Sequence, residues 1–182
     1  VFKGERSSTA KAYLSPLKSC SNLSVVTSAQ VERVMVEDSI AKGVIYKNKL
    51  GVNMQAIANK EVILSAGAVG SPHLLMLSGI GPAAHLKNHG IEVVVDLPGV
   101  GQNLNDHPDF VLKYKSLKPF SIWPKTKSYM KLIAGMQWIL TRKGICASNH
   151  FDAVGCIRSG PGVEYPDIQL TISPIAVDDQ TW

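Results

Sequence analysis

A short apolar run, followed at once by glycine and a helix start, constrains the fold of this chain more than any other feature. Residues 61–67 read Glu-Val-Ile-Leu-Ser-Ala-Gly, with no alternation of apolar and polar side chains. Such a run is typical of a strand buried on both faces, as in a parallel sheet. We expect a helix to follow, with Ser71 as its cap and Pro72 in its first turn. This region is therefore predicted to be α/β.

Strand-like segments precede this region. Four segments are rich in β-branched or apolar residues and are separated by turn-forming residues, at residues 23–27, 31–36, 43–46 and 52–58. Short strands with turns between them indicate antiparallel pairing of neighbours. We therefore expect a β-meander before the α/β region, and a short helix over residues 4–16 before the meander.

The second half of the chain mixes helices and strands. Pro82 is expected to open a short helix that Gly90 closes, and a longer helix is expected over 127–142. The remaining strands are predicted at residues 91–96, 110–115, 151–158 and 168–172. The pattern of predicted helices and strands changes near residue 109, which predicts a boundary between two regions, 1–108 and 109–182.

Composition excludes several classes of protein. The net charge is +5, from 19 Lys and Arg against 14 Asp and Glu, and these charges are spread along the chain. No block of like charges marks a nucleic-acid-binding arm, so no nucleic-acid partner is expected. No apolar run is long enough for a membrane span and no signal peptide opens the chain. We expect a cytoplasmic or peripherally membrane-associated protein.

The cysteines predict neither disulfides nor a metal site. Cys20, Cys146 and Cys156 are odd in number and form no CxxC pair. We expect buried or partly buried free thiols in a reducing compartment. The chain begins at Val1 and ends at Trp182 in polar sequence, which we interpret as a piece of a longer protein.

Residues 67–81 carry a specific resemblance. Their sequence, GAVGSPHLLMLSGIG, resembles the second signature of the glucose–methanol–choline (GMC) oxidoreductases at every defined position. The similarity extends to further stretches, at residues 4–14, 22–34, 96–107, 147–153, 157–159 and 166–169. The last three of these most resemble the choline dehydrogenase branch of the family.

The resemblance implies a fold in two parts. The first is an α/β flavoprotein domain, Rossmann-like and FAD-binding, with a β-meander; residues 1–108 would form part of it. The second is an α+β substrate domain built on an antiparallel sheet, of which residues 109–182 would form part. Only part of each domain is expected in this chain.

The resemblance also implies a chemistry. FAD accepts hydride from an alcohol, a histidine near the C-terminus of family members removes the hydroxyl proton, and electrons pass to a quinone-type or other acceptor. The G-x-G-x-x-G fingerprint expected earlier in such proteins is absent here, as is the segment with that histidine. We therefore assign none of the five histidines as catalytic and expect this piece alone to be inactive.

Three residues are candidates for cofactor binding. The resemblance implies that the backbone of Val31 holds the FAD adenine. Ala66 and Gly67 end the apolar run with small residues, which lets a bulky ligand approach the backbone closely.

Asp109 is the first candidate on the substrate side. The resemblance places it where choline-active relatives carry a glutamate facing the substrate ammonium, which a carboxylate can neutralise. Its alternative is a solvated acid at a strand edge. His107 either supports the pocket by hydrogen bonding or is a structural histidine tied to the turn at residues 103–106.

Two further candidates come from the last third of the chain. Asn149 either lines the substrate side or serves a turn. Thr171 departs from the family pattern, since choline-type relatives carry histidine there. Together with Asp109, this departure weakens choline as the substrate. Trp123 and Trp138 form either an aromatic wall or ordinary packing.

The sequence thus leads to one main hypothesis and two alternatives. The main one is FAD-dependent oxidation of a primary alcohol to an aldehyde, with choline or a choline-like alcohol as the first candidate substrate. The second keeps the family but has an uncharged aliphatic, aromatic or polyether alcohol as substrate. The third is a non-catalytic structural or binding module. Peripheral membrane association is compatible with each, and no sequence feature points to an oligomeric state.

Overall fold

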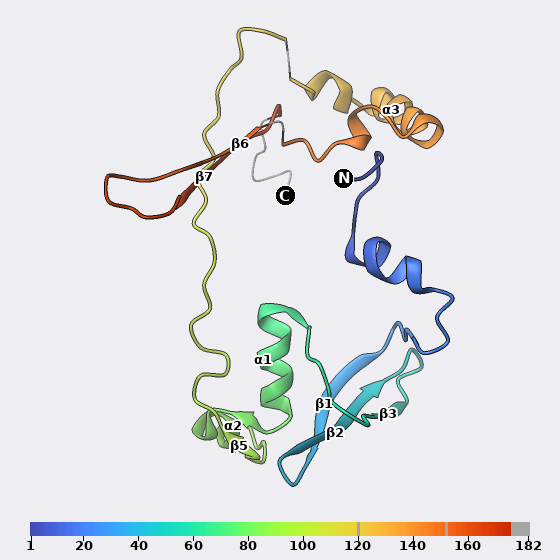
Figure 1. Cartoon of the computed structure of the whole chain (residues 1–182), viewed down its shortest axis with the longest axis vertical. Helices are drawn as coiled ribbons and strands as arrows, with labels where there is room; N and C mark the ends of the chain where they lie inside the picture. Colours follow the sequence, from blue (N-terminus) through green and yellow to red (C-terminus); the bar gives the residue numbers. More distant parts are fainter. Residues whose placement is uncertain (120, 152, 176–182) are drawn as a thin grey trace. The chain divides into compact units, whose positions relative to one another are not determined.

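The computed structural model describes residues 1–119, 121–151 and 153–175, which fall into two compact units (Figure 1). Unit 2 comprises residues 24–109. Unit 1 comprises residues 1–23 together with the described residues from 110 onward. Unit 2 contains an antiparallel sheet, two helices and a short parallel pair of strands, and unit 1 contains helical elements followed by one antiparallel hairpin, as expected for parts of an α/β and an α+β domain.

A three-stranded antiparallel sheet opens unit 2. Its strands are β1 (Gln30–Glu37), β2 (Ile40–Lys47) and β3 (Asn53–Ile57), in the order β1-β2-β3. The register between β1 and β2 shifts once between Val31 and Arg33, and again between Met35 and Val36. The predicted β-meander is confirmed, although residues 23–27 do not form a strand.

The main helix of unit 2 is α1 (Gly67–Leu77). It starts five residues earlier than predicted, so Ser71 is not its cap and Pro72 lies inside it. The Ser71 hydroxyl instead accepts a hydrogen bond from the Ala66 amide, 3.0 Å away. The prediction of a strand at 61–67 was wrong, because residues 61–66 find no strand partner among the described residues.

A small parallel pair follows α1. Strand β4 (Ile80–Gly81) pairs with β5 (Val95–Asp96), and α2 (Ala83–Asn88) lies between them in the chain. Pro82 precedes α2 and Gly90 follows it with a φ of +67°, as predicted. The strand predicted over 91–96 is shortened to its last two residues.

Unit 1 contains short helical turns and one long helix. The turns are η1 (Ala10–Leu14), η2 (Ser15–Leu17), η3 (Trp123–Thr126) and η4 (Ile145–Ala147). The long helix, α3 (Ser128–Thr141), confirms the prediction over 127–142, and Arg142 ends it in the left-handed conformation with a φ of 55°. The strand expected at 110–115 is absent.

A hairpin completes the described part of unit 1. Strands β6 (Ala153–Ile157) and β7 (Ile168–Ile172) pair antiparallel, with Ala153 opposite Ile172. Asp167 and Ser159 lie at the two ends of the loop between these strands. The Asp167 carboxylate accepts hydrogen bonds from the Ser159 hydroxyl at 2.6 Å and from the Ser159 amide at 2.7 Å. The bond from the Ser159 hydroxyl is the main cause that lowers the pKa of Asp167 below its ordinary value, and the bond from the Ser159 amide lowers it further.

Few described side chains are fully buried. The buried apolar residues are Val34, Leu74, Leu86 and Ala134, and only Leu86 is completely enclosed. The three cysteines are free and exposed, so the expectation of buried thiols was wrong. The small core leaves most of the apolar side chains of both units accessible.

Candidate functional site

The three residues predicted to contact a cofactor all belong to unit 2. Val31 is the second residue of β1 and is half-buried, with Tyr46 opposite it on β2. Ala66 and Gly67 lie at the start of α1. Because β1 is an edge strand, one side of its backbone is not paired within the sheet.

Strand β1 and helix α1 run in the same general direction in unit 2 (Figure 1). The starts of β1 and α1 therefore lie toward the same end of unit 2. A direct hydrogen bond joins the two elements farther along: the Val34 amide donates to the Ser78 hydroxyl at 2.8 Å.

The backbone at Gly67 is open to a ligand. Its φ is +86°, which side-chain-bearing residues rarely adopt, and no atom lies within 4 Å of the position that a Cβ would take. The first amides of an 11-residue helix follow directly, and such amides lack partners within the helix. The chain thus presents an uncovered backbone segment, which fits close approach by a large cofactor.

The cavity in unit 2 does not coincide with these three residues. It has a volume of about 360 Å³ and is lined by β1, β2, β3, the turn after α1 and the segment before β5, with polar groups from Arg33, Gln55 and Glu92 among others. Neither Val31 nor the Ala66–Gly67 pair lines it. The open backbone at Gly67, rather than this cavity, is therefore the feature that suits a cofactor.

His107 and Asp109 lie in an irregular segment at the end of unit 2, and both are exposed. The His107 amide donates to the Asp106 carboxylate at 2.8 Å, and the Asn105 side chain donates to the Asn103 carbonyl at 2.9 Å. These bonds are local, so they shape the turn at 103–106. Asp109 is the last residue of unit 2.

Asn149 and Thr171 belong to unit 1. Thr171 lies on β7 opposite Val154 and is exposed. The Asn149 side chain accepts a hydrogen bond from the Phe151 amide at 3.4 Å, in the loop before β6. Both residues therefore belong to the hairpin or its approach, and the seven predicted residues divide between the units: five in unit 2 and two in unit 1.

A cavity of about 390 Å³ lies in unit 1, beside α3. Met130, Ile133 and Ala134 give it an apolar wall, and Lys125 and His150 are its cationic or titratable residues. Asn149, next to His150 in the chain, does not line it, and neither does Thr171.

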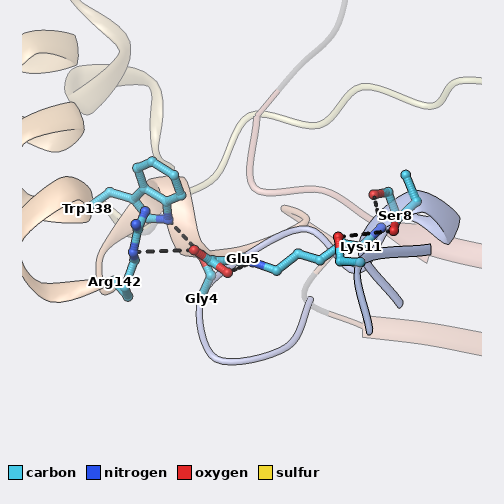
Figure 2. A network of polar contacts seen from close by, with 8 residues as sticks. Gly4, Glu5, Ser8, Lys11, Trp138 and Arg142 are labelled. Atoms are coloured by element: carbon cyan, nitrogen blue, oxygen red, sulfur yellow. Dashed lines mark hydrogen bonds and ion pairs between the residues drawn. The ribbon is translucent and has the colours of Figure 1, made fainter. Parts of the chain in front are cut away.

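A network that the sequence does not reveal joins the first residues of unit 1 to the end of α3 (Figure 2). The Trp138 indole N–H donates to the Gly4 carbonyl at 2.6 Å. Glu5 forms ion pairs with Lys11 and with Arg142, and the Arg142 guanidinium lies 4.2 Å from the centre of the Trp138 ring. Trp138 thus serves as a packing residue, one of its two predicted roles.

Two classes of site are not seen in the described parts of the chain. Across residues 1–119, 121–151 and 153–175, no three or more His, Cys, Asp or Glu side chains are placed to hold a metal ion. No helix in those ranges combines the length and the apolar character needed to cross a membrane.

Comparison with known proteins decides the family. The family model described as GMC oxidoreductase matches residues 1–109, more than half of the chain. The chain belongs to the GMC oxidoreductase family. The match covers β1, α1 and the candidate residues from Val31 to Asp109, so the resemblance seen in residues 67–81 is confirmed.

Curated GMC relatives are similar over almost the whole chain. The oxygen-dependent choline dehydrogenase of Rhizobium etli is 44% identical over 178 residues, which cover 97% of this chain and 32% of that protein. The protein of the same name from Brucella ovis is 42% identical over the same shares. The chain therefore spans about a third of the length of the curated relatives it matches.

Solved GMC structures share the fold. Formate oxidase of Aspergillus oryzae matches with a TM-score of 0.75 and 33% identity, over 85% of this chain and 27% of that one. A fungal aryl-alcohol oxidase matches with a TM-score of 0.70 and 26% identity, over 85% and 27%. These matches confirm the flavoenzyme fold class predicted from the sequence.

Sequence reasoning missed two structural features of these units. Ser78 belongs to the family-like stretch at residues 67–81, but its bond to β1 depends on a residue 44 positions away. The contact between Gly4 and Trp138 spans 134 positions. Neither separation leaves a periodic signal in the sequence.

Proposed function

We propose that the protein to which this chain belongs is an FAD-dependent alcohol oxidoreductase that converts a primary alcohol to an aldehyde, with choline or a choline-like alcohol as the first substrate. The single observation that carries the proposal is the 44% identity to an oxygen-dependent choline dehydrogenase across 97% of this chain. Membership of the GMC family supports the same reaction class.

Val31, Ala66 and Gly67 are the residues of this chain that would hold FAD. Val31 offers backbone groups on an edge strand, and Gly67 offers a backbone segment with open space in front of it. When bound, FAD supplies the acceptor for the hydride. The contribution of this chain is to place the cofactor, and no base for the alcohol proton is assigned to it.

Asp109 is proposed to face the cationic end of the substrate. A quaternary ammonium cannot donate hydrogen bonds, so an exposed carboxylate near it acts through charge. His107, Asn149 and Thr171 are proposed as further substrate-side residues. Residues 1–108 are proposed as part of the FAD domain and 109–182 as part of the substrate domain, although residues 1–23 cluster with unit 1.

The test is to express the full-length protein and assay dye reduction with a panel of alcohols. The panel pairs choline with a neutral analogue of the same size, in which a tert-butyl group replaces the trimethylammonium group. The proposal expects bound flavin and reduction of the dye with at least one primary alcohol. A purified protein without flavin that reduces no dye would overturn it.

An uncharged alcohol is the second candidate substrate. Asp109 is one methylene shorter than the glutamate expected in choline-active relatives, and Thr171 stands where they carry histidine. Both changes bear on the region proposed to bind the cation. Activity with the neutral analogue, combined with none towards choline, would favour this candidate.

The electron acceptor is proposed to be a quinone-type compound or dioxygen. The name of the Rhizobium etli relative includes oxygen dependence, whereas the family resemblance implied a quinone-type or other acceptor. Oxygen consumption measured beside quinone reduction, with the same alcohol, separates the two.

We propose a cytoplasmic or peripherally membrane-associated location for the full-length protein.

A further inference from the structure

Ser78 is buried at the junction between α1 and β1. Only 7% of its surface is exposed, and it is the buried polar residue among the described parts of the chain. It directly follows the last residue of α1. A buried hydroxyl is costly unless its hydrogen bonds are made, so the contacts of this side chain determine what it does.

Both hydrogen-bonding functions of the Ser78 hydroxyl are used. It donates to the Leu74 carbonyl at 2.6 Å, one turn back in α1, and accepts from the Val34 amide at 2.8 Å, in the middle of β1. The side chain therefore ties the last turn of the helix to the edge of the sheet, and it also satisfies a strand amide that has no other strand beside it.

Ser78 makes close contacts at this junction, although Val34, Ser78 and Gly79 also line the cavity of about 360 Å³ in unit 2. Val34 and Leu74, the two residues that it joins, are both buried. At Gly79, an added Cβ would lie 2.5 Å from the Glu92 carbonyl oxygen, so the chain after Ser78 is also held closely. The hydroxyl thus fixes the position of the end of α1 along strand β1.

We propose that Ser78 is a positioning residue for the cofactor: it fixes α1 against β1 and so sets where Gly67 lies relative to Val31. Val31 is three residues before Val34 on the same strand, and Gly67 begins the helix that Ser78 follows. Hydrogen bonds within the sheet and within the helix connect Val31 to Val34 and Gly67 to the end of α1, so a change at the shared bond moves the starts of both elements. The inference rests on the proposed FAD function.

The test compares Ser78→Ala with Ser78→Thr in the full-length protein, with Leu86→Val as the matched control. Alanine removes both hydrogen bonds, whereas threonine keeps the hydroxyl. Leu86 is fully buried in unit 2 and lies outside the α1–β1 junction, so its variant weakens packing without altering that bond. The readouts are the apparent melting temperature of the apoprotein and the dissociation constants of FAD and of ADP.

The expected result is a rise of about tenfold in the dissociation constants of FAD and ADP for Ser78→Ala. Ser78→Thr should lie within about twofold of wild type, and Leu86→Val should lower the melting temperature without that loss of affinity. Equal FAD affinity in Ser78→Ala and wild type, or equal loss in Leu86→Val, would overturn the inference. A wild-type protein that binds no flavin would instead overturn the proposed function.

Discussion

Gly4 lies so close to the end of α3 that a side chain has no room. An added Cβ would overlap the Arg142 carbonyl, and the φ of Gly4 is +73°. Gly90 has a similar φ, +67°, but open space around it. A comparison of alanine substitutions at the two positions therefore distinguishes the cost of steric overlap from the cost of backbone strain.

We expect Gly4→Ala to destabilise the full-length protein by about 2–4 kcal/mol, because strain and overlap add. Gly90→Ala should cost about 1–2 kcal/mol, from strain alone. Denaturant unfolding of the two variants measures the difference. Equal losses would show that the contact between Gly4 and Arg142 does not form in the full-length protein.

Asp109 gives a second prediction at this scale. If its carboxylate faces the substrate cation, Asp109→Ala should raise KM for choline about tenfold, since the lost attraction is worth about 1.4 kcal/mol in a partly solvated setting. The KM of the neutral analogue should stay within about twofold. Steady-state kinetics with both alcohols provide the measurement, and Asp109→Glu is the control that keeps the charge. A parallel rise for both alcohols would contradict the charge role.

The elements show how far the sequence could predict this structure. The strands β1 to β3, the helix α3 and the pair of Pro82 and Gly90 around α2 were predicted from local signals, namely β-branched runs, helical spacing and turn residues. The strand predicted at residues 61–67 was wrong, because a buried strand needs a neighbouring strand to form and the described residues provide none. The start of α1 was misplaced because Ser71 bonds back to Ala66 from within the helix.

The candidate site was predictable in part for the same reason. Val31 and Gly67 were proposed from the family pattern and from the small residues after an apolar run, and their contact with FAD stays a prediction. Ser78 and the contact between Trp138 and Gly4 were not found, because hydrogen bonds between distant residues have no local signature.

The β6–β7 hairpin carries a prediction about pH. The folded pKa of Asp167 is lowered by the hydrogen bonds from Ser159, so its contribution to hairpin stability is present above the unfolded pKa and is lost as pH falls through the folded pKa. In hydrogen exchange of the full-length protein, corrected for intrinsic rates, β6 and β7 amides should lose protection over this acidic range.

The control for this prediction is Asp167→Asn, which cannot ionise. Its hairpin should be less protected than wild type at neutral pH, and the difference should shrink as the wild-type carboxylate becomes protonated. A difference that is constant with pH would contradict the role of the charged carboxylate.

At the largest scale, the 182-residue chain exposes far more surface than a folded monomer of the same mass. It exposes 15358 Å² at a mass of 19.6 kDa. A single folded monomer of this mass would expose roughly 8,600 Å², and two separate domains of half the mass roughly 10,300 Å² together. Many of the exposed side chains are large and apolar, among them Ile63, Val69, Phe110 and Leu132.

This excess predicts that the isolated 182-residue chain does not unfold cooperatively. Its buried core is too small to offset the conformational entropy of ordering the chain. Calorimetry of the isolated chain should show no sharp transition, whereas the full-length protein should show one. A cooperative transition in the isolated chain would instead favour the stand-alone binding module.

The central claim is that the protein containing this chain binds FAD and reduces it with an alcohol. Anaerobic titration of the purified full-length protein with the alcohol that is active in the dye assay tests this most directly. The account predicts visible flavin absorbance that bleaches in proportion to the alcohol added, with one aldehyde formed per flavin reduced. A colourless protein, or a bound flavin that no alcohol bleaches, would contradict it.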